Sequence, residues 1–487
     1  MRTARMFVLL VLGAMASAPA AAEEVQLVTT NGLFDFRGEL LAFDGARYTL
    51  RSSLGTLTFP ADEVTCVGAA CPDVNEVASA FKIAGGPLVQ RLLVPELLDA
   101  YSLGVDTDIS RGTTADGNAL YELLSYQGES IVDVELVERD GAAAFADLAR
   151  GEASLVFSHR QASAEEAAEI TGRDAAALHR LKLERILALD AIAVTTGAQA
   201  GVDALSPDQL AAILSGDIRN WSEVGGSDLP ISVFTREEGA DLREIIDTLL
   251  LRPRDAAFRD DVIALDSDES LNAAVATFPN SIGFTDLGAI VDRDPLPILD
   301  ACGTAVPPTA FTVKTGEYPL GSAVYVYAAK GDISVHARGM VDFAQTSAGQ
   351  EILALAGYID LRPEAGPDRL PAPDWAGDEA RRLSTTFRLR EGTEPLDARD
   401  RLELEFLADY VRSGRAEGEE LLFVSHGEDG PAAARELLSL LFASYPDIEE
   451  RLTVGFRALP ADAAATAPCG ADAGITVQIW SRPLAEG

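Results

Sequence analysis

The residues with the clearest potential for chemistry lie in the stretch TREEGADLRE, residues 235–244. An apolar run precedes this stretch and an amphipathic pattern follows it, so we expect a strand that turns into a helix. The N-terminus of a helix presents free backbone N–H groups that favour an anion, and Arg236 is suited to a two-pronged contact with an oxyanion. However, Glu237, Glu238 and Asp241 stand in the same turn and oppose an anion by their charge. The pattern therefore predicts an anion site that carries an unusual number of acids.

The histidines do not form a catalytic or metal-binding pattern. His159, His179, His336 and His426 are scattered singly along the chain. No Ser-His-Asp order, nucleophile elbow or HExxH motif accompanies them. The simplest interpretation of each is a surface or loop residue. We therefore expect no enzyme, no cofactor and no metal site.

The start of the chain has the pattern of a secretory signal peptide. Arg2 and Arg5 precede an apolar run over residues 6–15, and small residues follow as far as Ala22. The run is too short to span a membrane, and no other stretch approaches the required length. No cysteine stands at the cleavage site to carry a lipid. We expect residues 1–22 to be removed and a soluble protein to reach the periplasm.

Four cysteines in an exported chain indicate disulfides, although four allow three connectivities. Cys66 and Cys71 are close enough to form a small local loop. In that case Cys302 and Cys469 would pair and tie two domains together. Zinc is the competing interpretation, and it is disfavoured because no histidine lies at ligand spacing from a cysteine.

The composition is strongly acidic, with 39 basic and 77 acidic residues and a formal net charge of −38. This charge repels nucleic acid and anionic membrane surfaces, so neither is an expected partner. It says little about a small anion, because salt screens the general field beyond roughly 10 Å.

Turn residues divide the chain into three folded segments. Residues 23–72 contain short alternating runs separated by Asn-Gly and Asp-Gly pairs, which predict the hairpins of a small β-barrel or meander. Residues 76–362 alternate helical patterns with short apolar strands, which is typical of an α/β architecture. Residues 363–380 are rich in Pro, Gly and acids and are predicted to be a linker. Residues 381–487 are predicted to form a compact α+β domain, with helices over 397–412 and 432–444.

The middle segment resembles a known family. LSPDQLAAILSGDIRNWSEVGGSDLPISVFTRE, residues 205–237, is similar to the signature stretch of PstS-like periplasmic binding proteins, which bind phosphate for transport. Further similar stretches follow the family's order from residue 81 to residue 361. The resemblance implies two α/β lobes joined by crossing strands, with the ligand held in the cleft between them. It also implies a small anion (phosphate or another) as ligand and an ABC transporter permease as partner.

The residues that would hold the anion depart from the family's pattern. In phosphate binders the turn after Arg236 typically carries Ser-Gly-Thr, whereas this chain has Gly239-Ala240-Asp241-Leu242. The first cradle, usually Gly-Ser, is Gly85-Gly86, and the third is Asp140-Gly141-Ala142-Ala143. The resemblance thus gives as candidate ligand-binding residues Gly86, Ser158, Arg160, Arg236, Gly239, Ala240 and Asp241. The loss of three charge-assisted hydrogen bonds would weaken phosphate binding by on the order of three decades.

The last segment resembles OmpA-like domains, in which a strand, a turn and a helix grip the peptidoglycan stem peptide. Residues 384–412 and 420–447 carry this resemblance. It implies peptidoglycan contacts by Glu428 or Asp429 and by Arg435. An acidic loop and an arginine on the face of a helix, with no binding role, are an equally good interpretation of these residues.

The predicted fold class is therefore α/β. We expect a two-lobed periplasmic-binding-protein fold, preceded by the small β-barrel or meander and followed by the OmpA-like domain. The predicted function is a periplasmic solute-binding protein with a divergent anion cradle and a cell-wall-associating tail. The alternative is a non-transport envelope adaptor with a degenerate cleft. Binding in the cleft would raise the melting temperature with ligand concentration, whereas the adaptor predicts co-purification with envelope partners.

Overall fold

The computed structural model describes residues 24–484, and the signal sequence predicted over residues 1–22 lies outside this part. Within 24–484 the description excludes residues 30–34, 44–46, 53–54, 61–63, 69–70, 72–79, 87–92, 140, 174–176, 182, 291–292, 332, 367–375, 377–378, 390–395, 397, 427–428 and 460–474. The chain divides into two compact units, residues 1–77 and residues 78–487.

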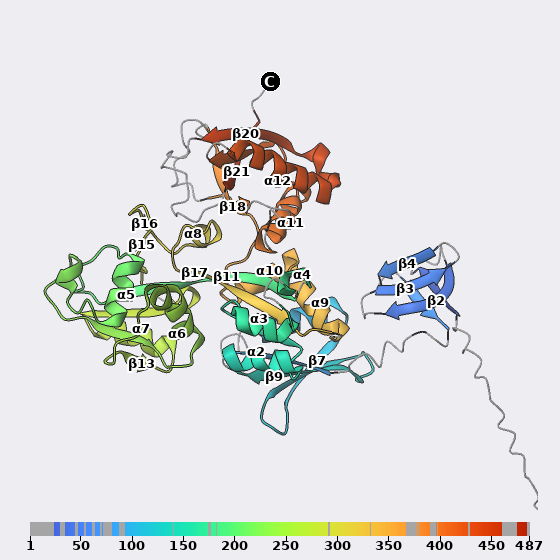
Figure 1. Cartoon of the computed structure of the whole chain (residues 1–487), viewed down its shortest axis with the longest axis horizontal. Coiled ribbons are helices and arrows are strands. Elements are labelled where there is room, and N and C mark those ends of the chain that lie inside the picture. The colour runs from blue at the N-terminus through green and yellow to red at the C-terminus, as the bar shows by residue number, and fades with distance from the viewer. Residues whose placement is uncertain are drawn as a thin grey trace, which may run out of the picture. The chain divides into compact units, whose positions relative to one another are not determined.

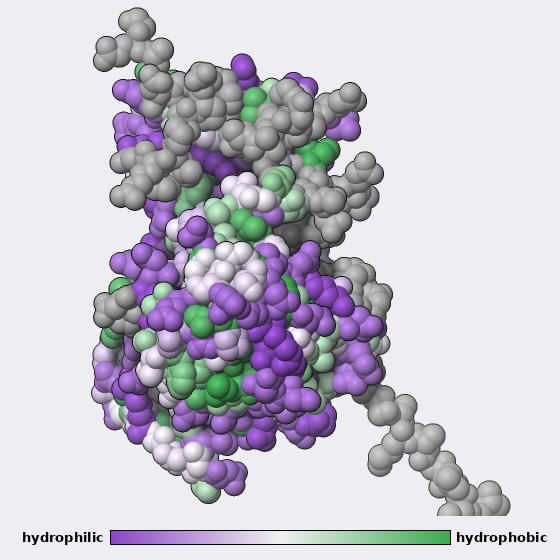
Figure 2. Space-filling view, turned by 90° about the vertical axis from the view of Figure 1, so that its left-hand side faces the viewer, coloured by the Kyte–Doolittle hydropathy of each residue, from purple (hydrophilic) through white to green (hydrophobic). Residues whose placement is uncertain are grey.

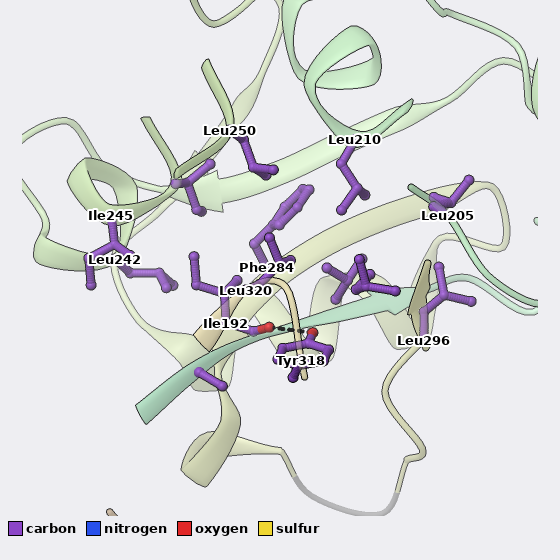
Figure 3. Close-up of a cluster of buried hydrophobic side chains, with 14 of the residues drawn as sticks. Ile192, Leu205, Leu210, Leu242, Ile245, Leu250, Phe284, Leu296, Tyr318 and Leu320 are labelled. Carbon is purple, nitrogen blue, oxygen red and sulfur yellow. Dashed lines mark hydrogen bonds between the residues drawn. The ribbon is translucent and has the colours of Figure 1, made fainter. Parts of the chain in front are cut away.

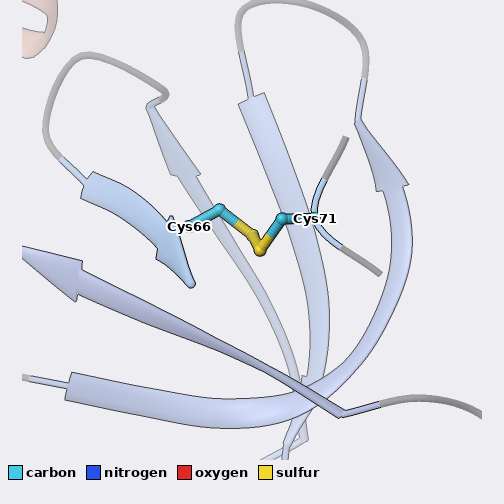
Figure 4. Close-up of a disulfide and its surroundings, with 2 residues drawn as sticks. All are labelled: Cys66 and Cys71. Atoms are coloured by element: carbon cyan, nitrogen blue, oxygen red, sulfur yellow. A yellow bond between two sulfur atoms is a disulfide. The ribbon is translucent and has the colours of Figure 1, made fainter. Parts of the chain in front are cut away.

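The first unit is an antiparallel five-stranded sheet. Its strands are β1 (Glu24–Thr29), β2 (Asp35–Phe43), β3 (Arg47–Ser52), β4 (Gly55–Pro60) and β5 (Val64–Val67), in the order β4-β3-β2-β1-β5. Alternating side chains of these strands make a small core of Val25, Leu27, Tyr48, Leu50 and Val64. Cys66 and Cys71 form the expected local disulfide, with their Cα atoms 5.7 Å apart (Figure 4). The predicted meander is thus present, whereas closure into a barrel stays a prediction.

The second unit is built on a mixed ten-stranded sheet. The elements before the central strand are β6 (Ala80–Gly85), α1 (Val94–Gly104), β7 (Asp108–Thr113), β8 (Ala119–Leu124), β9 (Ser130–Glu138), α2 (Gly141–Arg150), β10 (Leu155–Ser158), α3 (Ala164–Thr171) and α4 (Ala177–Arg180). Those after it are α5 (Pro207–Ser215), β12 (Ser232–Arg236), α6 (Asp241–Ile246), η3 (Asp247–Leu251), β13 (Ile263–Leu265), α7 (Asp268–Thr277), β14 (Ser281–Asp286), β15 (Ile298–Leu299), β16 (Ala305–Val306), α8 (Ala310–Lys314), β17 (Gly321–Ala328), α9 (Val335–Ala344) and α10 (Ser347–Leu355).

Two long strands join the two halves of this sheet. The strand order is β13-β12-β14-β11-β17-β10-β6-β9-β8-β7, where β11 is Glu184–Thr196. β11 pairs with β17 through its first half and with β14 through its second half. We call the part built on β6–β10 with α1–α4 and α9–α10 lobe 1, and the part built on β12–β14 with α5–α8 lobe 2. The two lobes lie on either side of β11 and β17 (Figure 1), which is the arrangement that the resemblance implies.

Each lobe has its own hydrophobic core. In lobe 2, Leu210, Ile245 and Phe284 pack around Ile192 of β11, and the hydroxyl of Tyr318 donates to the Ile192 carbonyl at 2.7 Å (Figure 3). Trp221, from the signature stretch, is fully buried and donates to the Asn280 carbonyl at 2.9 Å. The signature tryptophan therefore stabilises lobe 2.

The C-terminal part forms a four-stranded sheet with two helices. Its elements are β18 (Arg381–Leu389), α11 (Ala398–Arg412), β19 (Glu419–His426), α12 (Gly430–Ser444), β20 (Thr453–Leu459) and β21 (Ile475–Pro483), and the strand order is β18-β21-β19-β20. Most of the apolar side chains of this part form a core of its own. Leu402 and Phe406 of α11 instead belong to the core of lobe 2. The helix is therefore shared between the C-terminal domain and the binding domain.

Polar contacts also fix the C-terminal domain against α8. The carbonyl of Thr315 accepts from Arg388, and the carbonyl of Lys314 accepts from Arg399. Lys314 itself is buried and contacts the Asp360 carboxylate at 2.8 Å. The start of the predicted linker continues this attachment, since the Gly366 N–H donates to the Arg382 carbonyl at 2.7 Å.

The face shown in Figure 2 is mainly hydrophilic, with patches of hydrophobic residues between the polar ones. In the described part of the chain, no helix combines the length and the apolar character needed to cross a bilayer.

Candidate functional site

The candidate ligand-binding residues lie at the carboxyl ends of strands on both sides of the hinge. Gly86 follows β6, Ser158 ends β10, and Arg160 stands two residues further on in lobe 1. Arg236 ends β12 in lobe 2, and Asp241 begins α6. In α/β sheets ligands bind beyond the carboxyl ends of the strands, and here the two sets of ends face each other across the cleft.

Arg160 of lobe 1 is held by two carboxylates, one of them from the opposite lobe. Its Nη2 lies 2.7 Å from Oε1 of Glu166, and its Nη1 donates to the other Glu166 oxygen at 2.8 Å. Its Nε lies 2.8 Å from Oε1 of Glu244, which belongs to α6 in lobe 2. The guanidinium also stacks over Phe145, with its central carbon 4.8 Å from the ring centre. Arg160 therefore closes the cleft through an ion pair between the lobes.

Arg236 is likewise held within lobe 2. Its Nη2 donates to the Asp266 carbonyl at 2.7 Å, and its Nη1 lies 3.4 Å from the Asp268 carboxylate. Both side chains are largely buried. The cation that the sequence identifies for an oxyanion is therefore neutralised by the first turn of α7.

Gly86 and Asp241 meet across the cleft. A Cβ atom added to Gly86 would overlap the Asp241 carboxylate, which therefore fills the space of a side chain at this position. At the third cradle, a Cβ added to Gly141 would lie 3.0 Å from Oε2 of Glu244. Carboxylates of α6 thus occupy both glycine cradles of lobe 1.

The remaining positions shape the turn. Gly239 has φ +87°, a left-handed conformation that suits glycine. Ala240 is the N-cap of α6 and makes no side-chain cap hydrogen bond. Ser158 is buried, and its Oγ accepts from the Arg160 N–H at 3.2 Å. The predicted strand, turn and helix are present. α6 has six residues and continues as the π-helical turn η3 (Asp247–Leu251).

Behind these residues lies a group of buried acids. Burial raises the pKa of Asp286 well above its usual range, and the negative charges of Asp190, Asp268 and Asp241 add to the effect. Burial also raises the pKa of Asp190 and of Asp268. A raised pKa means that the fold disfavours the ionised carboxylate at each of these three positions, and a phosphate dianion placed beside them would disfavour it further.

His159 lies in a loop, as the sequence predicts, but it is not a surface residue. It is 5 % exposed, and its Nδ1 lies 3.8 Å from the Asp190 carboxylate, too far for a hydrogen bond. Burial lowers its pKa, so the ring is neutral at pH 7. The histidine follows β10 directly and lies beside Asp190 of β11 and the ring of Tyr358, which a single histidine in a sequence does not reveal.

The sequence pattern did not single out Asp190, Glu166, Glu244, Asp268 or Asp286. Asp190 had a visible signal, since it interrupts the apolar run LALDAIAV with a charge. Glu166 and Glu244 look like ordinary helix residues. Glu244 stands 84 positions from its partner Arg160, and Glu166, six positions from it, has the sequence signature of a helix cap. Sequence motifs identify the arginines of such a cleft. The carboxylates that contact these arginines can be identified only from the three-dimensional structure.

Other predicted positions lie apart from the cleft. Asp429 and Arg435 are exposed at the start of α12 and on its outer face, and Glu428 lies outside the described residues. Cys302 is disulfide-bonded, and its predicted partner Cys469 also lies outside the described residues. Within the described ranges, no group of three or more His, Cys, Asp or Glu side chains is arranged to hold a metal ion.

Comparison with known proteins relates the middle of the chain to phosphate-binding proteins. Residues 109–349 match the family model described as a PBP superfamily domain. The phosphate-binding protein PstS of Bacillus subtilis is 31 % identical over 196 residues, which is 40 % of this chain and 62 % of that protein. PstS of Borreliella burgdorferi is 27 % identical over 186 residues, 37 % of this chain and 66 % of that protein. The match thus spans less than two thirds of either relative.

Solved structures similar to this chain also include phosphate-binding proteins. A putative phosphate ABC transporter substrate-binding protein from Clostridium perfringens, with bound phosphate, has a TM-score of 0.44 and 20 % identity, and covers 58 % of this chain and 100 % of that chain. An ABC-type phosphate transport receptor from Vibrio cholerae has a TM-score of 0.44 and 19 % identity, and covers 57 % of this chain and 99 % of that chain.

Proposed function

We propose that this protein is an exported relative of phosphate-binding proteins whose cleft is occupied by its own carboxylates. It then serves in the cell envelope as a non-enzymatic adaptor and does not capture phosphate for transport. The relationship of residues 109–349 to the PBP superfamily supports the binding-protein origin. The internal carboxylates in the cleft support the loss of phosphate capture.

The observation that carries the proposal is that carboxylates of this chain contact the residues that the resemblance assigns to the ligand. Glu244 holds Arg160 from the opposite lobe, Asp268 holds Arg236, and Asp241 fills the space at Gly86. An entering phosphate would have to displace Glu244 and Asp241 while it approached the buried acids behind them. Displacing one charged contact such as the Glu244–Arg160 ion pair costs about 1.5–3 kcal/mol, which raises the dissociation constant for phosphate by at least about tenfold.

A solute receptor that passes an anion to an ABC transporter permease is the second candidate. The relationship to PstS over 196 residues favours it. In that case the anion would compete with Glu244 and Asp241 for the same donors, and the receptor would open before it binds. The two candidates differ in one measurable quantity, the affinity for phosphate.

Titration calorimetry of the mature chain with phosphate at fixed salt tests the proposal. We expect no saturable binding up to millimolar phosphate. The matched variant combines Asp241→Gly with Glu244→Gln, which removes both competing charges, and it should bind phosphate more tightly than the native protein. A native dissociation constant in the micromolar range or below would overturn the adaptor and favour the receptor.

For the C-terminal domain we propose the role that its resemblance to OmpA-like domains implies, which is to bind peptidoglycan. The exposure of Asp429 and Arg435 around the start of α12 supports this role. A domain of this kind would hold the closed binding domain near the cell wall.

A further inference from the structure

A cavity of about 560 Å³ lies where both lobes, the hinge strands and the C-terminal domain meet. Arg160, which also forms the ion pair with Glu244, is one of the residues that line this cavity. The volume falls within the range of small-molecule sites, which is roughly 300–1,000 Å³. The cavity is separate from the cradles at Gly86 and Gly141, because neither glycine belongs to its described lining.

One side of the cavity is apolar. Its apolar lining comes from Ile186 and Leu189 of β11, Ile245 of α6, Leu249 of η3 and Val313 of α8. These side chains come from the core of lobe 2 or pack against it, so their positions are fixed by the fold. An aliphatic chain in this space would exchange water for hydrocarbon, which favours binding.

The other side of the cavity is basic. Arg160, Arg388 and Arg399 line it, and its described lining contains no Asp or Glu. Arg388 is positioned by a 2.8 Å hydrogen bond from its Nη2 to the Thr315 carbonyl, and Arg399 by a 2.7 Å contact of its Nε with Glu403. In a protein with a net charge of −38, this concentration of guanidinium groups marks the cavity as a place for a negatively charged head group.

Two polar side chains of the lining lack hydrogen-bond partners among the described residues. Both ring nitrogens of His159 are buried in this state, and so is Oγ1 of Thr248. Buried polar groups in proteins are almost always hydrogen-bonded to protein, water or ligand. These groups therefore point to a polar occupant, which the apolar wall alone would not indicate.

We propose that this cavity binds a small amphipathic carboxylate with a medium-length hydrocarbon body. The carboxylate lies at the arginines contributed by the C-terminal domain, and the hydrocarbon lies against β11 and η3. The site exists because the C-terminal domain packs against the hinge, so it belongs to the joined domains and to neither alone.

Titration calorimetry of the mature chain with decanoate tests this site. We expect saturable binding of one decanoate per chain, with 1-decanol at least tenfold weaker because it lacks the charge. Arg388→Gln should lower the affinity for decanoate about tenfold. The matched variant Arg435→Gln, on the exposed face of α12, should leave this affinity unchanged. Phosphate titrated into the same samples reports on the cleft separately.

Two variants that fill the cavity complete the test. Thr248→Phe enters from η3 and Ser322→Phe from β17, and each should abolish decanoate binding while circular dichroism shows a folded protein. The second variant decides the matter if the first one does not fold. Absence of saturable binding in the native protein, equal binding of decanol, or unchanged binding in a folded filling variant would each overturn the proposal.

Discussion

Gly86 and Asp241 contact each other across the cleft, at a position that the resemblance assigns to the ligand. The Asp241 carboxylate takes the position of a side chain at residue 86, so the two residues depend on each other. A serine, which the family typically has at this position, fits only if the aspartate leaves. The divergence of the cradle is therefore a coupled change across the cleft.

Gly86→Ser alone should lower the free energy of unfolding by about 1–3 kcal/mol, the usual cost of overpacking a tight site. The same substitution combined with Asp241→Gly should cost less than the sum of the two single changes, because the overlap is removed. Chemical denaturation of the four proteins in this cycle gives the coupling energy. A serine variant as stable as the native protein would show that the cleft opens freely and that the coupling is absent.

The buried acids make the stability of the protein depend on pH. An unfolded aspartate loses its proton near pH 4, whereas burial and the neighbouring Asp190, Asp268 and Asp241 raise the pKa of Asp286 far above this value. Between the two pKa values the folded protein keeps a proton that the unfolded chain has lost. The stabilising contribution of this group is therefore complete below about pH 4 and is lost as pH rises towards its folded pKa.

Asp286→Asn removes this titration. Relative to the native protein, the variant should gain stability as pH rises from 4, since the native carboxyl becomes charged among Asp190, Asp268 and Asp241, with Arg236 as the facing cation. Burial lowers the pKa of His159, and this changes stability with pH in the opposite direction. Both proteins contain His159, so its effect cancels in the difference between their free energies of unfolding, measured by urea denaturation at each pH. Asp116→Asn, an exposed position between β7 and β8, is the matched control. A constant difference across the range would contradict the prediction.

The ligand role of Arg160, Arg236 and Asp241 stays a prediction. What the sequence indicates correctly is their place in the fold, since Arg236 ends a strand and Asp241 begins the helix that follows it. The contact of Glu244 with Arg160 spans 84 positions in the chain, so it depends on how far the lobes close. The closing angle has no local sequence signal.

Among the elements, α11 has the most unexpected position. Its length was predicted well, over 397–412 against Ala398–Arg412 in the structure. Its attachment was not predicted, since an amphipathic helix shows which face is apolar and not which core receives it. Leu402 and Phe406 enter the core of lobe 2, while Glu405 and Asp409 face Arg185 and Gln345 on the side of lobe 1. The helix therefore contacts both halves of the binding domain.

Phe406→Ala should destabilise the unit of residues 78–487 by about 3–5 kcal/mol, because a large side chain leaves a cavity in a shared core. The loss should affect the binding domain and the C-terminal domain together, in one calorimetric transition. Phe456→Ala on β20 is the control, since that side chain is 45 % exposed and its loss should cost far less. Two separate transitions, with only the C-terminal one shifted, would show that α11 does not join the cores.

In the whole molecule, the packing of α11 against the binding domain determines where that domain lies if the C-terminal domain binds the cell wall. If the C-terminal domain binds peptidoglycan, the binding domain is held there without a free linker. We expect the mature protein to co-sediment with purified sacculi and Arg435→Ala to release it. Arg388→Ala, which lies away from α12 in the described structure, is the control. Sedimentation that is unaffected by Arg435→Ala would remove this arginine from the interface.

The position of β17 has a consequence for how the chain reaches its compartment. β17 comes from residues 321–328, yet it lies between β10 and β11, which are made some 130–170 residues earlier. Until it is synthesised, both of these strands have an unpaired edge, and β11 is the one of the two crossing strands that joins the lobes. Pairings so distant in sequence form slowly. A nascent chain with a secretory leader would therefore stay unfolded long enough to be threaded across the membrane, and the same delay would leave its strand edges in need of a holding chaperone on the way.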